Sequence, residues 1–197
     1  MTHLRRWASM LILTIGAVFL IASPKASIKT IEVIQILDNV YSNAEAISLD
    51  PIEAKSERVN AKIAEAIYKR FKCQEDVALL AVQYAEEFAH KDFPRKQDLL
   101  AIIAIESSFN PSAEFKGSKG VMQVLVKTHR ARITGEFDLR EQIRVGASIL
   151  REYYEITGGK QAAVMSYNVG IGSYKRGARP EKYFGKYRKE LLWVSSL

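Results

Sequence analysis

The stretch that decides the fold is DLLAIIAIE, residues 98–106. A helix through these residues carries aliphatic side chains on every side, which is typical of a central helix buried inside a larger helical domain. Helical spacing places Glu106 on the same face as Leu99, Ile102 and Ile103. A carboxyl group in such surroundings loses hydration, so its pKa rises and it can donate a proton to a leaving oxygen near neutral pH. The alternative is that Glu106 stands at the helix end and reaches solvent or a basic partner.

Helical patterns continue on both sides of this stretch. Asp50, Pro51 and Glu53 have the spacing of a capped helix start, and that helix runs toward Phe71. No segment shows the period-two alternation of a strand, so we expect an all-α fold with short connections. The other expected boundaries are a helix start at 74–76, a break at Pro94, the end of the central helix at Pro111, a helix start near Val121, a capping box at Asp138 and Glu141, a break at 158–159, and short helices at 162–167 and 181–192.

The N-terminal region has the pattern of an export signal. Arg5 and Arg6 precede an uncharged, mostly apolar run at 7–23. This run is shorter than the roughly 20 residues of a comfortable membrane-spanning helix. We therefore expect residues 1–26 to be a signal peptide or a signal anchor, with possible membrane association through 7–23. An N-terminal helical extension should then occupy residues 27–72.

Charge and cysteine content exclude some classes of site. The net charge is +7, and it remains +4 without the three basic residues of the N-terminal segment. The late basic excess between Lys175 and Lys189 suits a polyanion or a solvated helix face, but no nucleic-acid recognition motif accompanies it. The single cysteine, Cys73, is expected at a helix junction and cannot form an intramolecular disulfide. Its position and the three scattered histidines lack the clustered spacing of a zinc site, so no metal is expected.

Three motifs follow one another in the second half of the chain. They are ESSFNP at 106–111, GVMQV at 120–124 and SYNVG at 166–170. In this order and spacing they resemble the transglycosylase SLT family, whose pattern reads Glu-Ser-x-Phe-x-Pro, then Gly-Leu-Met-Gln, then Ala-Tyr-Asn-x-Gly. The resemblance covers roughly residues 78–188. It implies a lysozyme-like helical catalytic domain, which we place at 73–197.

The resemblance also implies roles for the matched positions. Glu106 would be the catalytic residue, first as general acid and then as general base. Six further residues would bind substrate or support the acid: Ser107 by hydrogen bonding to the carboxylate, Met122 and Gln123 along the saccharide cleft, Tyr167 and Asn168 on its floor, and Tyr183 in contact with the acid. For Met122 and Tyr167, packing in the core is the alternative. Gln123 offers an amide donor and acceptor, which suits an amide-bearing sugar.

The sequence departs from the family pattern at Phe115, Val126 and Ser166, where the family commonly has serine, proline and alanine. The connection between Glu106 and Gln123 is also about one residue shorter. Loops tolerate such changes well. We therefore expect the departures to alter sugar contacts rather than the acid.

The implied reaction is cleavage of the bond between N-acetylmuramic acid and N-acetylglucosamine in peptidoglycan, with formation of a 1,6-anhydro ring and no cofactor. Most glycosidases use two carboxylates, and Glu114 is the nearest downstream candidate for a second one. The rival readings are a lysozyme-type hydrolase, including one used in phage lysis, and a catalytically silent wall-binding protein. The substrate and the N-terminus together predict an exported protein, periplasmic or anchored in the inner membrane, that could act with a cell-envelope machine.

Overall fold

The computed structural model describes residues 51–197, and side chains from residue 55 onward. The expected signal segment, the apolar run at 7–23 and most of the expected extension lie outside the described residues. Within the described part, no helix combines the length and apolar character needed to cross a membrane.

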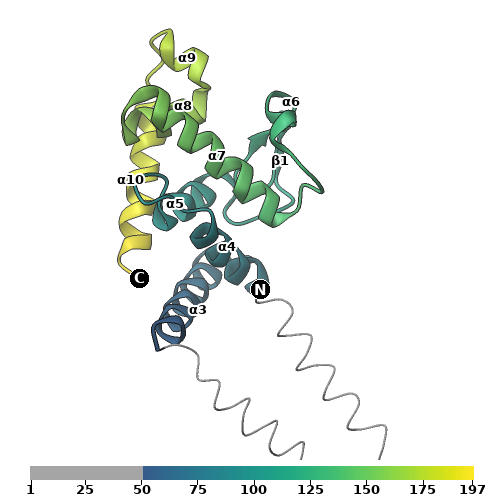
Figure 1. Ribbon diagram of the computed structural model, residues 1–197, viewed down its shortest axis with the longest axis vertical. Helices are drawn as coiled ribbons and strands as arrows, with labels where there is room; N and C mark the ends of the chain where they lie inside the picture. Colours follow the sequence, from purple (N-terminus) through teal and green to yellow (C-terminus); the bar gives the residue numbers. More distant parts are fainter. Residues whose placement is uncertain (1–50) are drawn as a thin grey trace, which may run out of the picture. The chain divides into compact units, whose positions relative to one another are not determined.

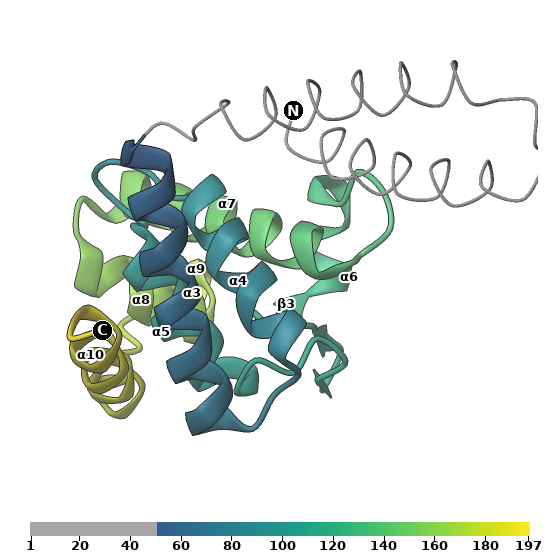
Figure 2. The same cartoon turned by 90° about the horizontal axis from the view of Figure 1, so that it is seen from below.

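Helices dominate the described region (Figure 1). Two long helices precede the central one, and five more follow the last strand of the sheet, as the labels of Figure 2 show in part. Their bounds are α3 Pro51–Phe71, α4 Glu75–Glu87, α5 Lys96–Ser107, α6 Val126–His129, α7 Leu139–Thr157, α8 Lys160–Val169, α9 Ile171–Lys175 and α10 Glu181–Ser195, with a 3₁₀ turn η2 at Arg130–Arg132.

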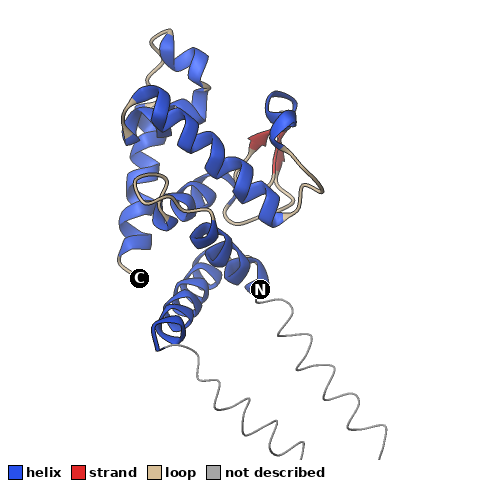
Figure 3. Cartoon of the chain, viewed as in Figure 1, coloured by secondary structure: helices blue, strands red, loops and turns tan. Residues whose placement is uncertain are grey.

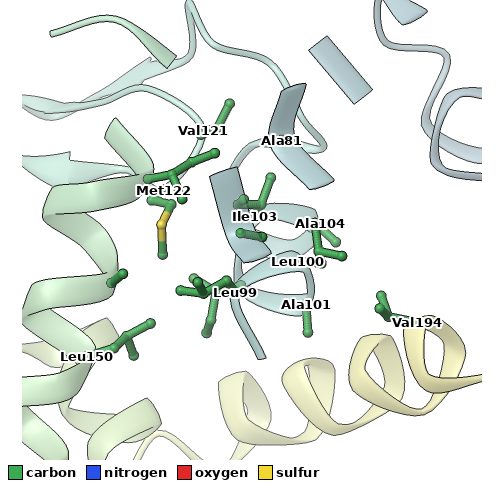
Figure 4. Packing of buried hydrophobic residues seen from close by; sticks show 14 of the residues in the cluster. Ala81, Leu99, Leu100, Ala101, Ile103, Ala104, Val121, Met122, Leu150 and Val194 are labelled. Carbon is green, nitrogen blue, oxygen red and sulfur yellow. The ribbon is translucent and has the colours of Figure 1, made fainter. Parts of the chain in front are cut away.

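The central helix α5 is buried as its composition predicts. Every residue from Leu99 to Ile103 is fully inaccessible to solvent. Its start is fixed by Asp98, whose Oδ2 accepts a hydrogen bond from the Arg95 amide at 2.9 Å. It ends after Ser107, because Ser108 adopts a left-handed backbone conformation with φ 54°. Figure 4 shows Leu99, Leu100 and Ala104 directed toward different neighbours of the helix, with α10 running alongside.

The N-terminal helix α3 belongs to this same core. Ile63, Ala64 and Ile67 are buried in the cluster that also contains α5, α7 and α10 side chains. The compact unit that contains this core runs from Ile52 to Leu197. Cys73 lies between α3 and α4, at the predicted helix junction.

A short sheet is the main departure from the all-α expectation (Figure 3). Strands β1 Glu114–Phe115, β2 Ser118–Lys119 and β3 Val124–Leu125 are antiparallel in the order β1-β2-β3. The expected helix near Val121 is wrong, because the chain there forms a turn into β3 and helix α6 starts only at Val126. Left-handed backbone at Gly117 and Gly120 permits the tight reversals.

The start of α7 confirms half of the predicted capping box. The Asp138 carboxylate accepts a hydrogen bond from the Glu141 amide at 2.8 Å. The Glu141 carboxylate does not return the bond to Asp138. It binds Arg144 and Thr134 instead, and the Arg144 guanidinium above all lowers its pKa to about 2.

Candidate active site

Glu106 lies in the last turn of α5, where the buried helix reaches the edge of the core. Its carboxyl is partly buried, and its Oε1 accepts a hydrogen bond from the Tyr183 hydroxyl at 2.5 Å. Burial raises the pKa of Glu106, and the Tyr183 bond offsets part of that rise by stabilising the anion. The observed environment is the one that the aliphatic neighbours in the sequence predict.

A cavity of about 470 Å³ opens in front of this carboxyl. The sheet, α6, α7 and α8 all contribute to its wall, so the sheet supplies one side and the helices the other. The lining residues are Glu106, Phe115, Ser118, Gln123, Val124, Leu125, Thr128, His129, Ile149, Tyr153, Tyr167, Asn168, Val169 and Gly170. Among them Glu106 is the only acid, so within the described residues one carboxyl faces this space.

Glu114 does not supply a second carboxylate to the cavity. It is exposed on β1 and pairs with Lys119 across the β1–β2 hairpin at 3.2 Å. It does not line the space that Glu106 faces. The geometry therefore separates the two acids, and Glu106 is the one carboxyl of the described residues that lines the cavity.

The turn at 120–123 is fastened to the helices by polar contacts. The Ser107 hydroxyl contacts the Val121 carbonyl oxygen at 2.8 Å, and the Tyr167 hydroxyl donates to the Met122 carbonyl at 2.8 Å. From α7, the Gln142 side-chain oxygen accepts the Val121 amide at 2.8 Å. Gly120 lies so close to the Gln142 side chain that any Cβ there would clash. Close packing against Gln142 therefore explains why residue 120 is a glycine. Gln142 itself holds the 120–123 turn in place and was not predicted from the sequence.

Gln123 faces the cavity from this turn. Its Nε2 donates to the carbonyl oxygens of Ala113 at 3.0 Å and Gly120 at 2.9 Å. These bonds hold the side chain in one orientation. Among the described residues its Oε1 has no hydrogen-bonding partner, so it is an acceptor available to a ligand donor such as a sugar hydroxyl or N–H.

The structure brings together most of the residues predicted from the motifs. Gln123, Tyr167 and Asn168 line the cavity with Glu106, and Tyr183 contacts the carboxyl directly. Burial, followed by the nearby Glu106 charge, raises the pKa of both Tyr167 and Tyr183 well above the usual range. Both hydroxyls therefore stay protonated at neutral pH and act as hydrogen-bond donors.

Met122 and Ser107 are not placed as predicted. The Met122 side chain is fully buried and lines no part of the cavity. It points into the core toward α7 (Figure 4), where the absence of a side chain at Gly146 makes room for its sulfur. The Ser107 hydroxyl lies near the carbonyls of Val121 and Ile103 rather than bonding the Glu106 carboxylate. Both residues therefore shape the site through the backbone of the turn.

Several lining residues were not assigned a role from the sequence. Phe115 and Leu125 are exposed apolar side chains on β1 and β3, at 66% and 41% exposure. His129 enters from α6, and burial followed by the charge of Arg132 lowers its pKa, which favours the neutral imidazole. The sequence does mark Phe115 as unusual, since a large aromatic residue stands where the family commonly has a small polar one. No cluster of three or more potential metal-ligating side chains occurs between residues 51 and 197.

Comparison with known proteins agrees with this geometry. The transglycosylase SLT domain model matches residues 83–189, more than half of the 197-residue chain. A curated transglycosylase from Enterobacteria phage PRD1 is 30% identical over 92 residues, which are 46% of this chain and 35% of the phage protein. The matched region thus spans about a third of that relative. No solved structure gives a significant match. On the family match, the chain belongs to the transglycosylase SLT-domain family.

Proposed function

We propose that this protein is a peptidoglycan lytic transglycosylase in which Glu106 acts first as general acid and then as general base. The observation that carries the proposal is the position of Glu106. It is a carboxyl of raised pKa and, among the described residues, the only acid lining a cavity of about 470 Å³.

In the first step the Glu106 proton passes to the glycosidic oxygen between N-acetylmuramic acid and N-acetylglucosamine. The bond from C1 to that oxygen breaks, and the N-acetylglucosamine side leaves as an alcohol. Burial favours the protonated carboxyl that this step needs. The muramoyl acetamido oxygen can stabilise the positive charge at C1.

In the second step the C6 hydroxyl of the same muramoyl unit attacks C1, and its proton returns to Glu106. A 1,6-anhydro ring forms and the carboxyl is regenerated. Between the two steps Tyr183 stabilises the Glu106 carboxylate, because its hydroxyl donates a hydrogen bond to the carboxylate oxygen. Since the substrate supplies the nucleophile, a single carboxylate is sufficient.

Product analysis of digested peptidoglycan tests the proposal. Mass spectrometry should find 1,6-anhydromuramoyl ends, whereas reducing ends would assign a lysozyme-type hydrolase. Glu106→Gln should lower the rate by about 10²–10⁴-fold, the usual contribution of acid–base catalysis. Glu114→Gln is the matched control, since Glu114 is exposed outside the cavity, and should keep the wild-type rate. Equal activity of Glu106→Gln and wild type would overturn the assignment of the acid.

We further propose that the protein is exported and acts in the periplasm or anchored to the inner membrane. The support is the basic start at Arg5 and Arg6 followed by the apolar run at 7–23. Cell fractionation tests this location: accumulation of the full-length protein in the cytoplasm would contradict it.

A further inference from the structure

A second cavity adjoins the one that contains Glu106. It has a volume of about 540 Å³ and lies at the start of α10 and the loop before it. Asn168 lines both cavities, so the two spaces meet at that residue. Tyr183 lines the second cavity while its hydroxyl bonds to Glu106. A molecule that occupies the second cavity is therefore one side chain away from the catalytic carboxyl.

The wall of this second cavity is basic. Arg179, Lys182 and Lys186 line it together with a single acid, Glu181. Within residues 55–197, neither lysine forms an ion pair with any acid. The two ammonium groups are one helical turn apart on α10, which places them on the same face. With three basic side chains and one acid, the wall of the cavity carries a net positive charge.

Arg179 is a fixed member of this group. Its Nη1 donates to the carbonyl oxygens of Tyr174 and Ala178, each at 2.8 Å. Its guanidinium also lies 4.0 Å from the centre of the Tyr174 ring, a stacked arrangement that orients the planar donor group. A guanidinium held in this way is suited to bind a carboxylate with little loss of side-chain entropy.

Resting on the proposed function, we propose that this second cavity binds the carboxylates of the peptide stem on the muramoyl unit being cleaved. In a peptide-bearing strand the lactyl carboxyl of each muramoyl unit is amide-linked to its stem, so the glycan backbone offers no anion to the three basic side chains. The stem does, because its acidic side chains and C-terminus are carboxylates, and it leaves the sugar through the lactyl group. An extended stem of four or five residues reaches roughly 13–18 Å, enough to pass from the Glu106 cavity across Asn168. The enzyme is then selective for strands that still carry their peptides.

The test compares two substrates and two double variants. The substrates are glycan strands with intact peptide stems, freed of phosphate-bearing wall polymers, and the same strands stripped of peptides by an amidase. The lactyl carboxyls that the amidase exposes are converted to methylamides, so that the stripped strands carry no anion. The ratio of their kcat/KM values measures peptide preference. Lys182→Gln/Lys186→Gln removes two charges from the cavity wall. Lys175→Gln/Arg188→Gln removes two exposed charges that line neither cavity.

We expect wild type to prefer peptide-bearing strands, and Lys182→Gln/Lys186→Gln to lower that preference by about tenfold, the effect of losing a charged contact. The control double variant should keep the preference within about twofold, because neither of its side chains lines the cavity in which the stem would bind. Strands whose stem carboxylates are converted to methylamides should behave like stripped strands, since the stem then keeps its length but loses its charge.

Three outcomes would overturn the inference: no peptide preference in wild type, an equal loss in both double variants, or full preference for the methylamide strands. A preference that appears only when phosphate-bearing polymers are left on the strands would also overturn it, because the anion would then be phosphate. These results are distinguishable from failure of the proposed function, in which wild type would release no anhydro product from any substrate.

Discussion

The two carboxylates of helix α5 have opposite surroundings although they lie two turns apart on the same helix. Asp98 is 1% exposed, and its oxygens accept from the Arg95 amide, the Lys160 ammonium and the Tyr187 hydroxyl. Glu106 accepts from Tyr183 alone among the described residues and faces an open cavity. Each carboxylate therefore has one tyrosine partner on α10, and they differ in what else surrounds the carboxyl.

The difference in surroundings gives the two carboxylates different roles: Asp98 holds neighbouring helices together, whereas Glu106 faces the cavity. A buried carboxylate with several donors joins the elements that supply those donors, because each hydrogen bond to a charged group contributes to stability. For Glu106, burial raises the pKa and the single donor opposes that rise, and a raised pKa favours the protonated form that an acid needs before it donates. The first turn of the helix thus anchors α8 and α10 through Asp98, and its last turn holds the proposed catalytic acid.

Asp98→Asn should produce the largest stability effect. Asparagine keeps the size of the side chain but loses the charge and turns an N–H group toward existing donors. Because hydrogen bonds to charged groups contribute about 1.5–3 kcal/mol each, we expect the free energy of unfolding to fall by about 3 kcal/mol. Urea denaturation measures this loss. Activity per folded molecule should persist, and an unchanged urea midpoint would mean that Asp98 does not anchor the helices.

Glu106→Gln should have the opposite effect on stability, in a pH-dependent way. Burial raises the pKa of Glu106 in the folded state, so wild type loses stability as pH rises from below the unfolded pKa through the folded one. The amide does not titrate. The variant should therefore match wild type at acidic pH and exceed it at neutral pH, by about 1.4 kcal/mol for each unit of pKa elevation. Denaturation curves at several pH values test this, and a difference independent of pH would refute the raised pKa.

Tyr183→Phe tests the one hydrogen-bond donor that the described residues offer to the Glu106 carboxyl, the proposed catalytic acid. The Tyr183 hydrogen bond lowers the pKa of Glu106, so its removal should raise that pKa further. The basic limb of the pH–activity profile, above which the acid is deprotonated, should then move to higher pH. Tyr187→Phe is the matched control on the same helix and should leave the profile unmoved while lowering stability, because it removes a donor to Asp98. Equal profiles for the two variants would contradict the distinction between the tyrosines.

The sequence predicts those features that depend on neighbours along the chain. The apolar stretch 99–105 predicts the buried helix, and the spacing of Asp138 and Glu141 predicts the start of α7. The motifs predict which residues meet around Glu106, since the chain belongs to a family in which they recur.

The features that could not be predicted depend on distant packing or on very short elements. Strands of two residues are too short to show alternation. The inward position of Met122 depends on Gly146 of a different helix. The bond from Tyr187 to Asp98 joins residues 89 positions apart, so it follows from how α10 packs against α5 and not from any local pattern.

Ser166 carries a buried hydroxyl without a hydrogen-bond partner among the described residues, and its substitution should have the smallest effect on stability. Its Oγ is fully buried, and no described residue forms a hydrogen bond with it, at a position where the family commonly has alanine. Ser166→Ala removes a desolvated polar group, so we expect stability to rise by up to about 1 kcal/mol. Ser107→Ala is the control that loses the contact to the Val121 carbonyl and should destabilise by about 1 kcal/mol. If both variants lower the urea midpoint equally, the Ser166 hydroxyl has a hydrogen-bond partner such as a buried water. The two serines would then not differ in whether their hydroxyls are hydrogen-bonded.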